Sequence, residues 1–93
     1  MFEVSMLTNT VEVVNNLGLH ARPATMLVKT ASKYKSKITI RKKDLSVDAK
    51  SIMGVLILAA QKGVRLTIEI DGPDEEAAMK EVVELFASGF GEE

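Results

Sequence analysis

The sequence predicts an α+β fold in which a four-stranded antiparallel sheet is covered on one face by three helices. Short segments alternate apolar and polar residues, which is typical of half-buried strands. Longer segments repeat apolar residues three and four positions apart, which is typical of amphipathic helices. These segments follow one another in the order βαββαβα. A length of 93 residues suffices for one hydrophobic core, so we expect a single domain over residues 1–93.

Four segments carry the strand pattern. It is clearest in residues 64–70, where the apolar side chains of VRLTIEI alternate with polar ones. Weaker alternation marks residues 11–13, 38–40 and 45–49, and the polar residues 41–44 between the last two segments predict a hairpin. Because these strands have one polar face, we expect the helices to form a second layer on the other face.

The first helix is predicted to begin at Ala21. Pro23 falls in the first turn, where its missing backbone N–H is not needed for a helical hydrogen bond. The spacing of the apolar residues after it predicts one stripe that faces the sheet. This stripe consists of Ala24, Leu27, Val28 and Ala31.

Two further helices are predicted in the second half of the chain. Ser51 is a good N-cap for a helix over residues 52–60, and Gly63 is a typical residue just past a helix end. The acidic residues 74–76 suit the positive end of a helix dipole. They begin a third helix, which we expect to run to Gly89.

The composition excludes several classes of protein. The formal net charge of -1 argues against a dedicated nucleic-acid binder, which needs a basic excess. The absence of cysteine excludes a disulfide scaffold, a thiol nucleophile and a Cys-ligated zinc site. The longest apolar run, residues 52–60, falls well short of the roughly 20 residues that span a bilayer. Residues 1–6 carry no targeting signal, so we expect a cytoplasmic protein without membrane contact.

The one histidine of the chain, His20, is the strongest candidate for chemistry. It lies between Gly18 and Pro23, where a strand ends and a helix begins. Free N–H groups and the positive dipole at a helix N-terminus favour an anion, so a phosphate on His20 would be stabilised there. Arg22 would add a positive charge beside it. A neutral imidazole is also a nucleophile near neutral pH.

The residue types alone leave other interpretations open. His20 is equally compatible with an ordinary loop or capping role, whereas a metal site lacks a second His or any Cys. No serine lies in a nucleophile-elbow pattern. A small-molecule or regulatory domain of similar topology would tolerate His20→Ala. An acyl-phosphate hydrolase would need an arginine loop with a water-positioning asparagine, which is not evident here. An RNA-binding module would need aromatic residues on its central strands, and Phe2, Tyr34, Phe86 and Phe90 lie elsewhere.

Two segments resemble a known family, the histidine-containing phosphocarrier HPr of the bacterial phosphoenolpyruvate-dependent phosphotransferase system. Residues 18–25, GLHARPAT, resemble the active-site signature of the family, and residues 50–55, KSIMGV, resemble its regulatory serine signature. The resemblance covers residues 10–90 and implies the open-faced two-layer β-sandwich of the family. Residues 1–9 are then an N-terminal extension. Residues 41–44 lack the glycine that the family often has in this turn.

The resemblance implies a carrier rather than an enzyme. His20 would accept a phosphoryl group on Nδ1 from phosphorylated enzyme I and pass it to sugar-specific enzyme II A domains. Arg22 would neutralise the phosphate charge during both transfers. Neither a cofactor nor a metal is expected, and we expect the carrier to act as a monomer.

Ser51 has two interpretations that are compatible with each other. It is a plain helix N-cap by local sequence. The resemblance implies phosphorylation of Ser51 by an HPr kinase/phosphorylase, with a catabolite-control regulator as a further partner. The family also uses an exposed apolar surface against its partners, in which we expect flexible Met53 to be exposed. The candidate residues of this surface are Leu19, Thr25, Ile52, Met53 and Leu56.

Overall fold

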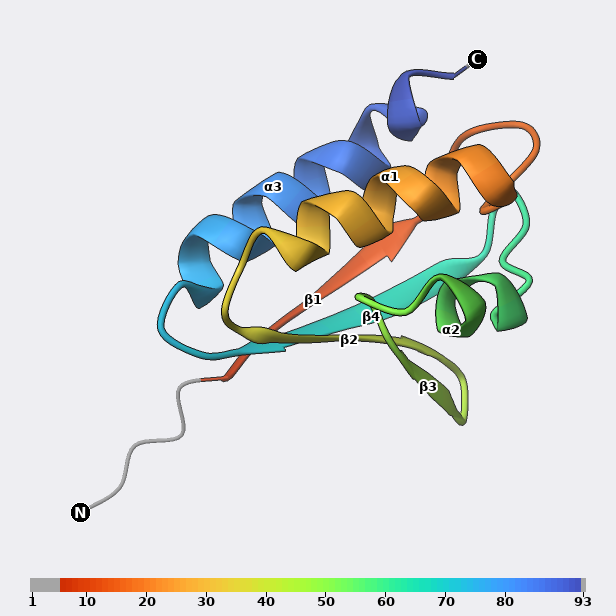
Figure 1. Ribbon diagram of the computed structural model, residues 1–93. Coiled ribbons are helices and arrows are strands. Elements are labelled where there is room, and N and C mark those ends of the chain that lie inside the picture. Colours follow the sequence, from red (N-terminus) through yellow and green to blue (C-terminus); the bar gives the residue numbers. More distant parts are fainter. Residues whose placement is uncertain (1–5, 93) are drawn as a thin grey trace.

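The computed structural model describes residues 6–92, and its elements follow the predicted order βαββαβα (Figure 1). The strands form one antiparallel sheet in the order β1-β4-β2-β3. The predicted fold class is therefore confirmed. The elements are β1 (Met6–Glu12), α1 (Ala21–Ser32), β2 (Lys37–Lys42), β3 (Leu45–Asp48), α2 (Ile52–Ile57), β4 (Arg65–Asp71), α3 (Glu75–Ala87) and a short 3-10 turn, η1 (Gly89–Gly91).

The core lies between the sheet and its helices. α1 and α3 run side by side over one face of the sheet, and α2 lies beside β3 (Figure 1). The apolar side chains of β2 and β4 point into this layer, while the alternate residues of these strands face the open side. Among the described residues, no helix combines the length and apolar character needed to cross a membrane. The largest fully buried side chains are Phe86, Phe90, Leu27, Ile38, Ile40, Leu58, Leu66, Ile68, Ile70, Val13, Val55 and Val82.

The first strand is longer than predicted. Residues 6–9, predicted to belong to an N-terminal extension, form the first half of β1. They pair with the end of β4, beginning with Met6 opposite Asp71. Leu7 packs against the core, so an apolar residue on the inner face explains why the strand continues here. The remainder of the predicted extension, residues 1–5, lies outside the described residues.

The second helix is shorter than predicted. The expected helix over residues 52–60 is wrong beyond Ile57, because Ala59 adopts a left-handed conformation with φ 49° that cannot continue a helix. The chain turns there toward the segment before His20. The carbonyl of Ala60 accepts a hydrogen bond of 2.8 Å from the backbone N–H of Leu19. The end of α2 is thus set by a contact distant in sequence.

Replacing Ala59 by glycine should stabilise the protein. An alanine in the left-handed region is strained by its Cβ, and this strain exceeds the extra entropy that glycine gives the unfolded chain. We expect Ala59→Gly to raise the free energy of unfolding by about 0.5–1 kcal/mol, measured by urea unfolding. Gly63→Ala is the matched opposite change, because Gly63 has φ 90° with nothing near its missing Cβ. A destabilised Ala59→Gly variant would contradict this explanation.

Asp74 joins the start of α3 to the loop between α1 and β2. It was predicted among the acids that begin this helix, but its side chain makes no capping hydrogen bond. It accepts hydrogen bonds from the backbone N–H groups of Lys35 and Ser36, at 2.9 and 3.0 Å, and from the Ser36 hydroxyl, at 2.6 Å. Glu75 instead accepts from the backbone N–H of Gly72 at 3.0 Å. Asp74 thus holds the two connections together.

This carboxylate should make the fold sensitive to acid. The Ser36 hydroxyl, followed by the Lys35 backbone N–H, lowers the pKa of Asp74 from its ordinary value of 3.8. A carboxyl group with a lower pKa in the folded state stabilises the fold above its unfolded pKa, and this contribution is lost as the pH falls through its folded pKa. We expect the free energy of unfolding to decrease as the pH falls below about 5 and on through the lowered pKa of Asp74. In urea unfolding, Asp74→Asn should reduce this slope, and an unchanged slope would be the contrary result.

Candidate functional site

His20 lies at the position that the sequence predicted for it. It is the N-cap of α1, with φ −79° and ψ −169°, and its carbonyl accepts a hydrogen bond of 2.9 Å from the N–H of Ala24. Its side chain is 37% exposed. In the first turn, the backbone N–H groups of Ala21 and Arg22 have no partner within the helix, and Pro23 carries no N–H. A group carried by His20 would therefore meet both solvent and the positive end of the helix dipole.

The turn before His20 requires a glycine. Gly18 has φ 67°, and a Cβ there would lie 2.4 Å from the carbonyl oxygen of Ala60. The same carbonyl accepts the N–H of Leu19, so the turn is fixed against the segment that follows α2. This contact positions the backbone of the histidine.

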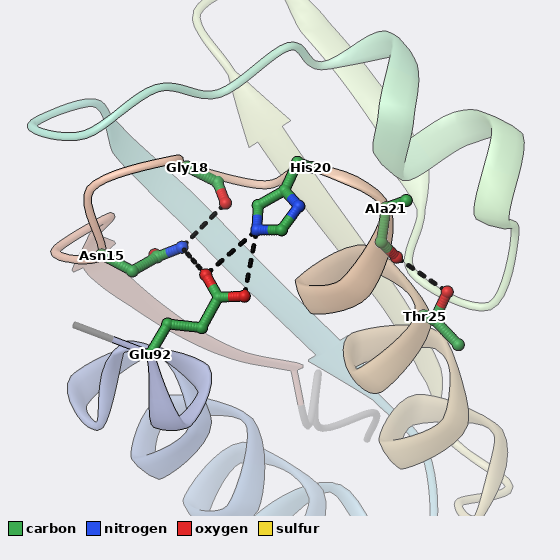
Figure 2. A network of polar contacts seen from close by, with 6 residues as sticks. All are labelled: Asn15, Gly18, His20, Ala21, Thr25 and Glu92. Carbon is green, nitrogen blue, oxygen red and sulfur yellow. Dashed lines mark hydrogen bonds and ion pairs between the residues drawn. The ribbon is translucent and has the colours of Figure 1, made fainter.

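Glu92 contacts the histidine ring from the far end of the sequence. Figure 2 shows its carboxylate facing Nε2 of His20, with both oxygens 3.0 Å from that nitrogen. The side-chain amide of Asn15 donates to Glu92 Oε1 at 3.1 Å and to the carbonyl of Gly18 at 2.8 Å. The sequence predicted neither residue. Glu92 lies 72 residues after His20, and no local pattern connects them.

This arrangement gives the two ring nitrogens different roles. In a neutral ring, a proton on Nε2 can be donated to Glu92, which leaves the lone pair on Nδ1. Within residues 6–92, no hydrogen bond reaches Nδ1. The hydrogen bond from His20 holds the pKa of Glu92 below its usual value, and the Asn15 amide and the charge of Arg22 act in the same direction against the opposing effect of burial. The carboxylate therefore stays ionised and accepts from Nε2.

Arg22 offers a positive charge close to the histidine. It is the second residue of α1, and its side chain is exposed. It makes no hydrogen bond or ion pair with any other part of the chain that the structure describes. Its guanidinium can therefore bind an incoming anion without first breaking an internal contact.

A comparison with protein families agrees with this site. The family model described as "PTS HPr component phosphorylation site" matches residues 7–88, a range that contains His20, Arg22 and Ser51. The chain belongs to the HPr family. Glu92 lies beyond the matched range.

Similar proteins support this assignment over almost the whole chain. The phosphocarrier protein HPr of Xylella fastidiosa is 48% identical over 88 residues, which cover 95% of this chain and 99% of that protein. That of Neisseria meningitidis is 45% identical over 87 residues, covering 94% and 98%. The crystal structure of HPr-C-His from Thermoanaerobacter tengcongensis has a TM-score of 0.90 and 46% identity, and the match covers 94% of this chain and 98% of that one. The HPr fold is thus confirmed.

The serine of the second HPr signature caps α2 as predicted. Ser51 Oγ accepts a hydrogen bond of 3.1 Å from the backbone N–H of Gly54. The side chain remains partly exposed. The capping role is therefore confirmed.

Most of the apolar surface predicted from the HPr resemblance lies on α2. Met53 is 65% exposed, as expected, and Ile52 and Leu56 are also exposed. Ile57, which was not among the predicted residues of this surface, is 60% exposed. We refer to the residues Ile52, Met53, Leu56 and Ile57 as the α2 patch. The available signal was a short helix, apolar on nearly all sides, in a domain too small to cover more than one side of it.

Of the two other residues predicted for this surface, Leu19 is buried and Thr25 is exposed. Leu19 is 4% exposed and belongs to the core, so its side chain is unavailable to a partner. Its neighbour Leu17 is instead 74% exposed. Thr25 is exposed as expected, although its hydroxyl donates to the carbonyl of Ala21 at 2.8 Å.

Proposed function

We propose that this HPr-family protein accepts a phosphoryl group on Nδ1 of His20 from phosphorylated enzyme I and passes it to sugar-specific enzyme II A domains. One observation carries this proposal. The carboxylate of Glu92 is hydrogen-bonded to Nε2 of His20, whereas Nδ1 has no hydrogen bond in the described part of the chain. The ring lies at the N-terminus of α1. Family membership supports the role of carrier.

The transfer forms one bond and breaks one bond. The Nδ1 lone pair attacks the phosphorus carried by enzyme I, the bond between phosphorus and enzyme I breaks, and its electron pair stays with enzyme I. Nε2 keeps its proton, so the hydrogen bond to Glu92 persists in the phosphorylated ring. The first turn of α1 and Arg22 would stabilise the charge on the phosphoryl oxygens. Delivery to an enzyme II A domain repeats the same exchange in the opposite sense.

The α2 patch and the exposed residues Arg22 and Thr25 suit contact with successive partners. An exposed apolar surface with a flexible methionine can adapt to several proteins. A partly exposed histidine can meet the phosphorylated group of each partner without a deep pocket. Family membership also supports the expected cytoplasmic location. That the carrier acts as a monomer stays a prediction.

Incubation with enzyme I and phosphoenolpyruvate labelled on phosphorus tests the proposal. The wild-type chain should acquire acid-labile label, and His20→Ala should acquire none while keeping a folded circular dichroism spectrum. The label should leave the carrier when an enzyme II A domain is added. Acid-stable label that survives in His20→Ala would overturn the proposed function.

We further propose that an ATP-dependent kinase phosphorylates Ser51 to regulate this transfer. The side chain is partly exposed, and a phosphate there would remain next to the helix whose first turn the serine already caps. It would add about −1.5 to −2 charges beside the α2 patch. A charge beside an apolar docking surface disfavours binding of a partner, because binding would remove water from that charge.

Ser51→Asp should therefore slow acceptance of phosphate from enzyme I by about 10-fold, mainly through weaker docking. Initial rates at several carrier concentrations separate a raised KM from a lowered kcat. Ser46→Asp is the matched control, because it adds the same charge at an exposed position of β3. An equal rate for Ser51→Asp and wild type would count against the regulatory role.

A further inference from the structure

Asn15 is a buried polar residue at the junction of the histidine loop and the C-terminal turn. Its side chain is 1% exposed. One amide nitrogen donates to two acceptors, the carbonyl of Gly18 and Oε1 of Glu92, as Figure 2 shows. Both acceptors require an N–H group, so they fix the orientation of the amide. One acceptor belongs to the turn before His20 and the other is the partner of its ring.

This orientation is kept against a penalty. Asn15 Oδ1 is buried and has no hydrogen-bond partner among the described residues. A buried carbonyl oxygen without a partner is unfavourable, so an asparagine with no further role would be poorly suited to this position. If the amide were flipped, Oδ1 would face a carbonyl and a carboxylate, and neither of these can donate a hydrogen bond to it. The two donated hydrogen bonds are what the residue provides here.

We propose that Asn15 is a positioning residue for His20, acting through Glu92. Both carboxylate oxygens of Glu92 face Nε2, and Asn15 binds one of them. The amide thereby holds the carboxylate within hydrogen-bond distance of Nε2, where it accepts the Nε2 proton, and this keeps the Nδ1 lone pair free. The inference rests on the proposed function, because it concerns the nitrogen that would receive the phosphoryl group.

The packing around Asn15 supports this role. Gly89, at the start of η1, lies so close that a Cβ there would be 3.5 Å from Cβ of Asn15. The backbone N–H of Glu92 donates to the carbonyl of Gly89 at 2.9 Å, which directs the chain end back toward the loop. Asn15 therefore contacts the C-terminal turn through both its packing and its amide. A substitution of Asn15 should therefore change the position of Glu92 first.

Nitrogen-15 NMR of the unphosphorylated full chain tests the positioning directly. In the wild type, the neutral His20 ring should carry its proton on Nε2, as judged by the ring nitrogen shifts. Asn15→Ala and Glu92→Ala should each move these shifts toward a mixture of the two tautomers. Asn16→Ala is the matched control, since Asn16 is the exposed neighbour and its side chain accepts a hydrogen bond from Lys62 rather than from the histidine site. Its ring shifts should equal those of the wild type.

Phosphoryl acceptance from enzyme I gives the second readout. Asn15→Ala and Glu92→Ala should each slow it by about 10-fold, and the double variant should be no slower than either single one, because the two residues act in series. A folded Asn15→Ala with wild-type ring shifts, or slowing that multiplies in the double variant, would overturn the proposal. If Asn15→Ala does not fold, the NMR signals of the Asn15 side-chain amide are compared between Glu92→Ala and the wild type. We expect these signals to shift in Glu92→Ala, and unchanged signals would overturn the proposal. The NMR arm requires no phosphate, so its failure is distinct from failure of the proposed function.

Discussion

Replacing Arg22 by alanine should slow phosphoryl transfer to and from His20 by about 100-fold, the usual effect of removing one donor that stabilises transition-state charge. The guanidinium is exposed and makes no ion pair within residues 6–92, so it is available to the phosphoryl oxygens. Removing it leaves that charge to the first turn of α1 alone. Rapid-quench measurement of acceptance from enzyme I and of delivery to an enzyme II A domain checks both steps.

Two further variants separate this role from a general loss of positive charge. Arg22→Lys keeps the charge without the planar fork of donors, so its rates should fall between those of Arg22→Ala and the wild type. Lys29→Ala removes a positive charge from the last turn of the same helix and should stay near wild-type rates. Equal slowing by Lys29→Ala and Arg22→Ala would mean that Arg22 has no specific part in the transfer.

Phe90→Ala should lower the free energy of unfolding by about 3–5 kcal/mol. Phe90 is fully buried, and its ring packs edge-on against Phe86, with 5.0 Å between centroids and an interplanar angle of 72°. Its backbone has φ 57°, a conformation that a bulky residue adopts only when its surroundings hold it. Loss of this ring should also free Glu92 from His20. Urea unfolding gives the first effect, and the His20 ring shifts in NMR give the second.

Phe90→Leu provides the control for this prediction. It retains much of the apolar volume in the same backbone conformation, so we expect a loss of less than about 1.5 kcal/mol and a retained contact between Glu92 and His20. For Phe90→Ala itself, we expect the free energy of unfolding to fall by about 3–5 kcal/mol. A decrease of less than about 1 kcal/mol would show that this ring does not anchor the C-terminal turn.

The features that sequence predicted are those with local causes. The alternation in residues 64–70 and the apolar stripe of the first helix depend on neighbours a few positions away, and both elements are present within a residue or so of their predicted positions. The N-cap at Ser51 depends on an amide three residues ahead. The helix start at His20 could be predicted because Gly18 and Pro23 constrain the backbone next to them.

The features that sequence missed depend on contacts between distant segments. Glu92 and Asn15 form part of the site because the C-terminal turn packs on the histidine loop, and no spacing in the sequence records this. The end of α2 at Ile57 depends on the approach of Ala60 to the same loop. Leu19 is adjacent to His20, but its hydrogen bond to Ala60 fixes a backbone direction that turns its side chain into the core.

Nitrogen-15 and phosphorus-31 NMR of the wild-type chain, after incubation with enzyme I and phosphoenolpyruvate, shows directly whether Nδ1 of His20 carries the phosphoryl group. We expect one phosphorylated site, with phosphorus bonded to Nδ1 of His20, a proton retained on Nε2, and loss of the signal when an enzyme II A domain is added. Phosphorus on Nε2, on another residue, or on a ring that does not pass it to the enzyme II A domain would show that His20 Nδ1 is not the site of a phosphoryl relay.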